Sequence, residues 1–230
     1  MKKFLTLWLE GPLQAWGYDS RFDTRRTLSF PTRSGLTGML LAAAGASGPQ
    51  QELLAELAEY PLNVYSFHDS GPALTDFHMV GNGYGSATNW AKLMAPKKLD
   101  GSTPVGGGAK LTRRDYLVDR CFAAIWIMPE QPAEKFAAAL RNPVYELYLG
   151  RKCCVASELI FQGSFPTESE ALARVRELAE RKKRMPEWVY QEVPERESDS
   201  ESLLLADVPL RFGLHKLYRE RCVNKMVFVF

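Results

Sequence analysis

Residues 4–12 read Phe-Leu-Thr-Leu-Trp-Leu-Glu-Gly-Pro, and this stretch opens the fold. Its first six residues form an apolar run with the length of a buried strand, and the closing Gly-Pro pair ends the pattern. A polar loop follows, and then a helix begins for which either Thr32 or Ser34 can supply the N-cap. Gly35 and Gly38 lower the stability of that helix, so they indicate close approach by another backbone or by a ligand.

Apolar runs farther along the chain predict the remaining elements of one domain. They are a short helix at 50–59, strands at 62–68 and 73–80, a strand at 120–128, a helix from Pro132 to about Arg141, and a strand at 155–161. The order strand, helix, strand, strand, helix, strand is that of ferredoxin-like domains. The sequence therefore predicts an α+β fold, a modified ferredoxin-like (RRM-like) domain over residues 1–163. The same fold carries enzymes, metal chaperones and RNA-recognition modules, so it does not decide the function.

A glycine- and lysine-rich insertion interrupts this order at residues 81–110. It contains seven glycines and four lysines and shows little apolar periodicity. From 81 to 116, six Lys or Arg residues stand against two Asp, which gives a local charge of +4. Long loops of this kind are usually functional or disordered, and a basic, flexible arm suits a folded single strand of RNA. We therefore expect a β-hairpin thumb inserted at about 81–116.

The C-terminal part, residues 164–230, is expected to pack on the same domain. Thr167 and Glu170 have the spacing of a capping box and predict a helix that runs to about Arg184. Residues 186–201 are acidic, which predicts a mobile surface loop. The chain then closes with a small β extension, two short strands at about 208–212 and 223–230.

Bulk composition describes an ordinary globular protein. Of the 230 residues, 46% are hydrophobic and 24% are charged, which excludes wholesale disorder. The net charge is only +2, so a case for nucleic-acid binding depends on where the charges lie. The N-terminal apolar run is too short for a signal peptide, and no run is long enough to span a bilayer. We expect a cytoplasmic protein without a membrane segment.

Neither a metal nor another cofactor is expected. The four cysteines are Cys121, Cys153, Cys154 and Cys222, and no two of them have the C-x-x-C spacing of a zinc site. Buried free thiols in a reducing compartment are the simpler interpretation. No Walker loop, G-x-S-x-G, H-E-x-x-H or paired-carboxylate motif is present.

Three clusters of residues have the chemistry to bind RNA. The first combines Gln14 and Trp16 with Arg21, Arg25, Arg26 and Arg33, and Ser34 follows at a helix start. The second closes the insertion with Lys110, Arg113, Arg114 and Tyr116, and the third contains Arg151 and Lys152. Arginine forks hold phosphates, aromatic rings stack on bases, and helix N-termini offer N–H groups to phosphate. The alternative for the first cluster is a solvated loop with a core tryptophan.

A ribonuclease that works by general acid–base catalysis would want a histidine near a lysine or tyrosine. The chain has three histidines, His68, His78 and His215, and His78 lies at the base of the insertion. A ribonuclease mechanism would need a lysine or tyrosine beside it, for which Lys92 and Lys110 are candidates. No partner is fixed by local spacing, and a single histidine is more often structural.

Three ordered segments carry a resemblance to a known family. They are Gly11-Pro-Leu-Gln-Ala-Trp-Gly17, Phe30-Pro-Thr-Arg-Ser-Gly-Leu36 and Tyr148-Leu-Gly-Arg-Lys152. They closely resemble the CasD branch of the Cas five family, the repeat-associated RNA-binding proteins of type I-E CRISPR Cascade. The resemblance covers most of the chain to about residue 163, with weaker agreement at 114–119 and 207–209. Residues 164–205 match poorly, and the thumb differs in length and sequence.

This resemblance implies a non-catalytic subunit of a CRISPR ribonucleoprotein complex in antiviral defence. It implies that the protein caps the 5′ handle of the CRISPR RNA, contacts a CasC backbone subunit and a CasA large subunit, and meets target DNA through the assembled complex. Phosphates or handle bases would be held by Arg25, Arg26, Arg33 and Arg114, with Trp16 and Tyr116 packing or stacking and Arg151 and Lys152 extending the track. Type I-C relatives cleave precursor RNA with a Tyr/Lys/His set, so a metal-independent endoribonuclease using His78 stays open. A scaffold without direct RNA contacts is the third hypothesis.

Overall fold

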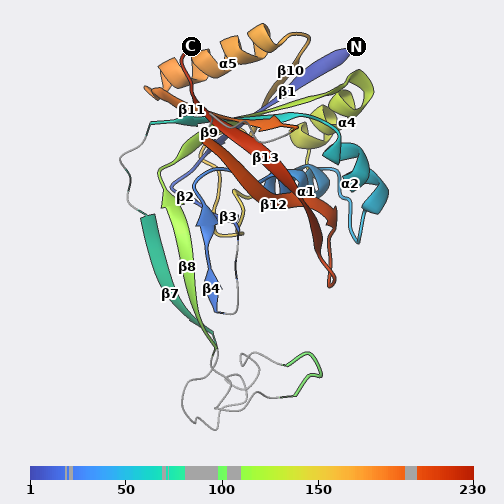
Figure 1. Ribbon diagram of the computed structural model, residues 1–230, viewed down its shortest axis with the longest axis vertical. Coiled ribbons are helices and arrows are strands. Elements are labelled where there is room, and N and C mark those ends of the chain that lie inside the picture. The colour runs from blue at the N-terminus through green and yellow to red at the C-terminus, as the bar shows by residue number, and fades with distance from the viewer. Residues whose placement is uncertain are drawn as a thin grey trace.

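The computed structural model describes residues 1–18, 20, 23–68, 71, 73–80, 98–102, 110–194 and 201–230, and these form a mixed α+β fold (Figure 1). The described helices are α1 (Arg33–Ala43), α2 (Gln51–Ala58), α4 (Glu130–Arg141) and α5 (Glu168–Arg181). The long strands are β1 (Lys2–Glu10), β6 (Leu62–Phe67), β7 (Ala73–Val80), β8 (Lys110–Val118), β9 (Cys121–Pro129), β10 (Phe161–Phe165), β11 (Pro186–Val193), β12 (Glu201–Arg211) and β13 (Leu217–Val227). Two-residue strands lie between β1 and α1: β2 (Leu13–Gln14), β3 (Trp16–Gly17), β4 (Thr24–Arg25) and β5 (Thr27–Leu28).

A seven-stranded antiparallel sheet forms the centre of the molecule, in the order β10-β1-β9-β6-β11-β13-β12. Strand β1 pairs along its whole length with β9, from Lys2 opposite Pro129 to Glu10 opposite Cys121. Because side chains alternate across a strand, β1 is buried on both of its faces. Leu5, Leu7 and Leu9 join one hydrophobic cluster, and Trp8 joins the other.

Helices cover both faces of this sheet (Figure 1). Apolar residues of α1 and α4, including Leu36, Leu40 and Phe136, pack with the leucines of β1 in the larger cluster. On the opposite face, Val175 and Leu178 of α5 pack with Trp8 in the smaller cluster. Both predicted caps are present: Thr32 Oγ1 accepts from the Gly35 N–H at 3.2 Å, and Thr167 Oγ1 accepts from the Glu170 N–H at 3.2 Å.

Strands β7 and β8 form a second, smaller sheet that extends away from the central one (Figure 1). The pairing is antiparallel from Ala73 opposite Leu117 to Val80 opposite Lys110, and β2 and β4 add to the other edge of β8. Strand β7 does not pair with β6, the strand that precedes it in the chain. Both edges of β6 are already occupied, by β9 on one side and by β11 on the other, so β7 pairs with β8 instead.

The sequence interpretation was also wrong about the first part of the expected acidic loop. Residues 186–193 form strand β11, which pairs with both β6 and β13. The segment Trp188-Val189-Tyr190 supplies β-forming, apolar side chains among the acidic ones, and Tyr190 stacks on Phe30 with ring centroids 3.8 Å apart. Burial of these rings outweighs the acidic composition.

Two further boundaries differ from those expected. The strand expected at 155–161 begins at Phe161 instead, since Val155 is exposed and residues before Phe161 run as irregular chain. The two short C-terminal strands are longer than expected, because β12 and β13 each have 11 residues. Among the described residues, no helix combines the length and the apolar character needed to cross a membrane.

Candidate nucleic-acid interface

The motif residues Gln14 and Trp16 lie inside the protein. The Gln14 side-chain amide donates to the carbonyl of Leu9 at 3.0 Å and to that of Arg120 at 2.7 Å. Its oxygen accepts the indole N–H of Trp16 at 3.0 Å. Because both side chains are buried and their polar atoms are paired, they position the loop between β1 and α1.

Two glycines of the motifs let this loop approach its neighbours. The Trp16 ring lies over Gly35 so closely that a Cβ at Gly35 would come within 2.9 Å of it. Gly150 has φ +95°, and a Cβ there would lie 1.8 Å from the carbonyl oxygen of Ala15. The close approach expected at Gly35 is therefore made by an aromatic side chain of this chain, whereas a Cβ at Gly38 would meet open space.

Arg33 is also an internal residue, with 1% of its surface exposed. Its guanidinium binds the Glu192 carboxylate and donates to the carbonyls of Leu57 at 2.6 Å and Tyr60 at 2.7 Å. Its backbone N–H donates to Asp207 at 2.7 Å, and the same carboxylate receives two hydrogen bonds from Arg221. Burial lowers the pKa of Arg33. The acceptors of its guanidinium are one carboxylate and two backbone carbonyls. In this chain, Arg33 fastens the start of α1 to α2 and to the C-terminal strands.

Ser34 is one of the residues that line a cavity beside α1. The cavity has a volume of about 330 Å³ and is lined by residues of α1, by the segment 146–150 and by Phe212. The Ser34 hydroxyl donates to Thr32 Oγ1 at 3.4 Å. Tyr148, on the opposite wall, donates its hydroxyl to Glu146, and this hydrogen bond raises the pKa of Tyr148.

The remaining described cations of the three predicted RNA-binding clusters lie where the β7–β8 pair leaves the core. Strand β4 runs parallel to β8, which places Thr24 opposite Arg113 and Arg25 opposite Arg114. The Arg151 guanidinium bridges the two segments, since it donates to the carbonyls of Arg25 and Asp115, both at 2.8 Å. We call Arg25, Arg26, Arg113, Arg114, Arg151 and Lys152 the basic junction.

The residues of the basic junction differ in exposure and direction. Arg26, Arg113 and Lys152 are exposed, and the others are partly buried. Because side chains alternate along a strand, Arg113 and Arg114 point to opposite faces of β8. The Nε of Arg114 donates to Thr112 Oγ1 at 3.2 Å, which leaves the tip of its guanidinium available for other contacts.

The ring of Tyr116 packs against the Arg151 guanidinium of the basic junction. It is 5% exposed, and the Arg151 guanidinium lies 4.5 Å from its ring centroid. Its hydroxyl lies 3.6 Å from the Cys153 sulfur. Burial, followed by this contact, raises the pKa of Tyr116. The ring face next to Arg151 is therefore occupied, and Tyr116 holds the arginine in one orientation.

His78 lies on β7 directly opposite Thr112, whereas Arg114, two residues farther along β8, lies opposite Asp76. Its Nδ1 is buried and has no hydrogen-bond partner among the described residues. Arg21 and the greater part of the expected thumb, residues 81–97 and 103–109, lie outside the described residues, as does the side chain of Lys110. In the part of the chain that the structure describes, no three His, Cys, Asp or Glu side chains are placed to hold a metal ion.

Sequence reasoning missed an exposed apolar strip on the β7–β8 pair. Phe77, Met79 and Leu111 are 61%, 56% and 45% exposed, and Met79 lies opposite Leu111. The signal was the alternation of these residues with polar ones, which predicts that they share one face of a strand. Apolar side chains that gather on one exposed face mark an interaction surface more often than scattered ones do.

Similar proteins place this geometry in one family. Residues 4–230 match the family described as CRISPR-associated protein (Cas_Cas5). The chain is 31% identical over 175 residues to the CRISPR system Cascade subunit CasD of Escherichia coli (strain K12), which covers 71% of this chain and 72% of that protein.

Solved structures agree with this match. A chain of a CRISPR RNA-guided surveillance complex superposes with a TM-score of 0.74 at 28% identity, over 97% of this chain and 89% of that chain. A second structure, described as a crystal structure of a Cas protein, has the same fold with a TM-score of 0.61 at 24% identity, over 97% and 94% of the two chains. The family resemblance of the three sequence motifs is thus confirmed, and the chain belongs to the CRISPR-associated Cas5 family.

Proposed function

We propose that this protein is the CasD-type subunit of a Cascade surveillance complex, and that it holds the 5′ handle of the CRISPR RNA without cleaving it. The observation that carries the proposal is the basic junction, in which Arg151 ties β4 to β8 through two 2.8 Å hydrogen bonds. The similarity to E. coli CasD and to a chain of an RNA-guided complex supports the assignment.

The proposed mechanism is retention by pre-oriented cations. Strand pairing fixes the backbone of Arg25, Arg113 and Arg114, so no backbone freedom is lost at these residues when their side chains bind phosphate. Guanidinium groups bind phosphate oxygens in pairs and can stack on unpaired bases. Gln14, Trp16, Arg33 and Tyr116 are buried and make polar contacts within the chain, so we assign them a supporting role rather than direct contact with RNA.

The finer features of the fold enter the same proposal. The order β1, α1, β6, β9, α4, β10, with the four strands adjacent in one sheet, supports a ferredoxin-like core. We assign β7 and β8, with the segment between them, to the thumb, and residues 164–230 to an extension that packs on the same domain. The apolar strip of Phe77, Met79 and Leu111 is the surface that we assign to a neighbouring CasC or CasA subunit.

A metal-independent endoribonuclease is the second candidate. It rests on one observation, the buried Nδ1 of His78 without a described partner, beside the basic junction. General acid–base cleavage needs a second group within reach of the attacking or leaving oxygen. Among the described residues, no lysine or tyrosine forms a hydrogen bond with Nδ1 of this imidazole, which favours the non-catalytic function.

One experiment separates these functions from a scaffold that binds no RNA. Purified protein is incubated with repeat-derived RNA in EDTA, and both retention on a filter and the length of the RNA are measured. We expect salt-dependent retention of intact RNA. A discrete cut that disappears in His78→Ala would establish the endoribonuclease instead. Absence of retention at low salt, with a folded protein, would favour the scaffold.

A further inference from the structure

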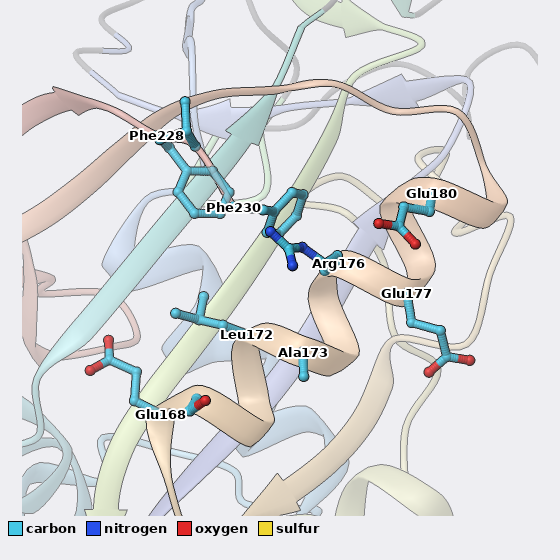
Figure 2. Close-up of a pocket in the computed structure, with 10 residues that line it drawn as sticks. Glu168, Leu172, Ala173, Arg176, Glu177, Glu180, Phe228 and Phe230 are labelled. Carbon is cyan, nitrogen blue, oxygen red and sulfur yellow. The ribbon is translucent and has the colours of Figure 1, made fainter.

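A groove lies on the face of the molecule that α5 covers, between this helix and the last three residues of the chain, Phe228–Phe230 (Figure 2). Its volume is about 580 Å³. The helix wall runs from Glu168 to Glu180, a span of about 18 Å at 1.5 Å per residue. The proposed RNA-binding function makes no use of this groove.

The middle of the groove is apolar and firmly supported. Leu172 and Ala173 line it from the helix, and Val229 and Phe230, 75% and 36% exposed, line it from the tail. The tail is held in place because the Phe228 ring lies 5.0 Å from that of Phe230 and its N–H donates to the Glu187 carbonyl at 3.0 Å. An apolar surface that is held open in this way favours a partner that removes it from water.

The two ends of the groove are acidic. Glu168 stands at one end, and Glu177 and Glu180 stand at the other (Figure 2). The cation among the lining residues is Arg176, whose guanidinium lies 5.2 Å from the Phe230 ring, over the apolar middle. Glu177 is paired with Arg174 at 2.6 Å, so Glu168 and Glu180 determine the charge at the ends.

We propose that this groove binds a segment of another protein, with apolar side chains at its centre and a lysine or arginine toward each end. The spacing of Glu168 and Glu180 fits about three turns of helix or a strand of five to six residues. Acidic ends repel RNA phosphates and anionic lipid headgroups and attract basic side chains, so charge complementarity favours a basic protein segment. The groove and the basic junction belong to separate parts of the molecule, α5 and the base of β7–β8, so both can be occupied at once (Figure 1).

The first test uses a synthetic peptide of about four helical turns with leucines along one face and lysine at both ends, and a second peptide with glutamate in place of lysine. Binding of each to the full chain is measured by fluorescence polarisation. The net charge of the chain is only +2, so non-specific attraction does not favour the lysine peptide. We expect the lysine peptide to bind and the glutamate peptide to bind at least about tenfold more weakly.

Two pairs of variants locate the binding. Glu180→Lys should weaken binding of the lysine peptide about tenfold, whereas Glu170→Lys, an exposed reversal on the same helix outside the groove, should not. Val229→Glu should weaken binding of the same peptide, whereas Val227→Glu, at a residue 70% exposed outside the groove, should not. Equal effects within either pair, or preference for the glutamate peptide, would overturn the proposal. RNA retention should be unchanged in all four variants.

The second test identifies the occupant in the assembled ribonucleoprotein complex. A photoreactive phenylalanine analogue replaces Ala173, which is exposed in the groove, and the cross-linked peptide is sequenced by mass spectrometry. We expect a segment of another subunit with basic residues on both sides of apolar ones. Cross-links to RNA, to a second copy of this chain, or to no partner would refute the proposal while leaving the RNA-binding function intact.

Discussion

Gly150 leaves less room for a side chain than any other glycine that the structure describes. It combines a φ of +95° with a backbone that touches the carbonyl of Ala15. Gly150→Ala should therefore destabilise the protein through both backbone strain and overpacking, by about 2–5 kcal/mol in urea unfolding. Gly213→Ala is the matched control, because Gly213 has φ +98° but open space around the Cβ position. It should cost only the strain, about 1–2 kcal/mol; equal losses would contradict a role for the Ala15 contact.

Arg114 is the residue on which the RNA-binding proposal can be tested most directly. It lies on a paired strand, it is partly buried, and its Nε donates a hydrogen bond to Thr112 within the described part of the chain. Arg114→Ala should weaken binding of handle RNA by about 1–3 kcal/mol while the melting temperature of the free subunit stays nearly unchanged. Arg114→Lys should recover only part of the loss, because an ammonium cannot form the paired contact.

The control for this series is Arg219→Ala, which removes an arginine that is half exposed and belongs to β13 rather than to the basic junction. Binding is measured by filter retention at one salt concentration, since affinities at different salt cannot be compared. If Arg114→Ala and wild type bind equally, Arg114 does not belong to the interface. A large fall in melting temperature would instead assign it to the stability of the β8 region.

At the scale of the elements, one carboxylate joins the end of β1 to the chain that leaves α5. Glu10 receives hydrogen bonds from Trp8 at 3.0 Å and from Arg184 at 2.8 Å, and Lys182 lies 2.8 Å from it. Burial raises the pKa of Glu10, but the hydrogen bonds from Lys182, Trp8 and Arg184 outweigh it, and the net pKa is lowered from 4.5. The folded state thus binds a proton less readily than the unfolded state.

This shift predicts how stability depends on pH. A carboxylate with a lowered pKa stabilises the folded state fully above its unfolded pKa, and that contribution is lost as the pH falls through the folded pKa. Glu10→Gln should therefore cost about 2 kcal/mol near neutral pH. The difference from wild type should narrow as the pH falls below about 4.5. Urea unfolding across this range checks it; a gap that stays constant would show that Glu10 acts through packing instead.

The segment that joins β7 to β8 can be replaced while both strands of the pair are kept. Replacing residues 81–109 by Asn-Gly joins Val80 to Lys110, which already lie opposite each other, through a two-residue hairpin turn. The melting temperature should stay within a few degrees of wild type, because both hydrophobic clusters of the described residues are built from residues outside the replaced segment. Retention of guide RNA or assembly of the complex should fall. Normal assembly and normal RNA retention of this variant would show that the replaced segment does not hold the guide RNA.

At the scale of the whole molecule, the sequence predicted the elements better than their partners. The apolar runs and caps located β1, α1, α4 and α5 correctly, because helix periodicity and capping are local properties. Pairing is not local. Strand β6 pairs with β11, which lies more than a hundred positions farther along the chain. Because β6 is occupied in this way, β7 pairs with β8. Strand β11 was missed because its acidic residues masked Trp188 and Tyr190, whose burial is decided by tertiary contacts.

The sequence predicted which residues make up the candidate site but not which of their side chains are buried. The motifs around Gln14, Arg33 and Arg151 do meet in space, as a binding surface would require. In a sequence, an arginine that binds phosphate cannot be distinguished from one that forms a buried ion pair. Arg33 forms a buried ion pair with Glu192. The difference is set by Glu192 and Asp207, far along the chain, and nothing near Arg33 in the sequence reveals them.

The pairing of β1 also has a consequence for how the protein is made. Its two partners, β9 and β10, come from residues 121–129 and 161–165, and the outer strands close only with residue 227. A ribosome adds about 5–20 residues per second. The first strand synthesised must therefore wait for several seconds, unpaired and apolar on both faces, until β9 emerges. During translation the N-terminal segment stays exposed until β9 is made, and the basic junction can assemble only after residue 152 has left the exit tunnel.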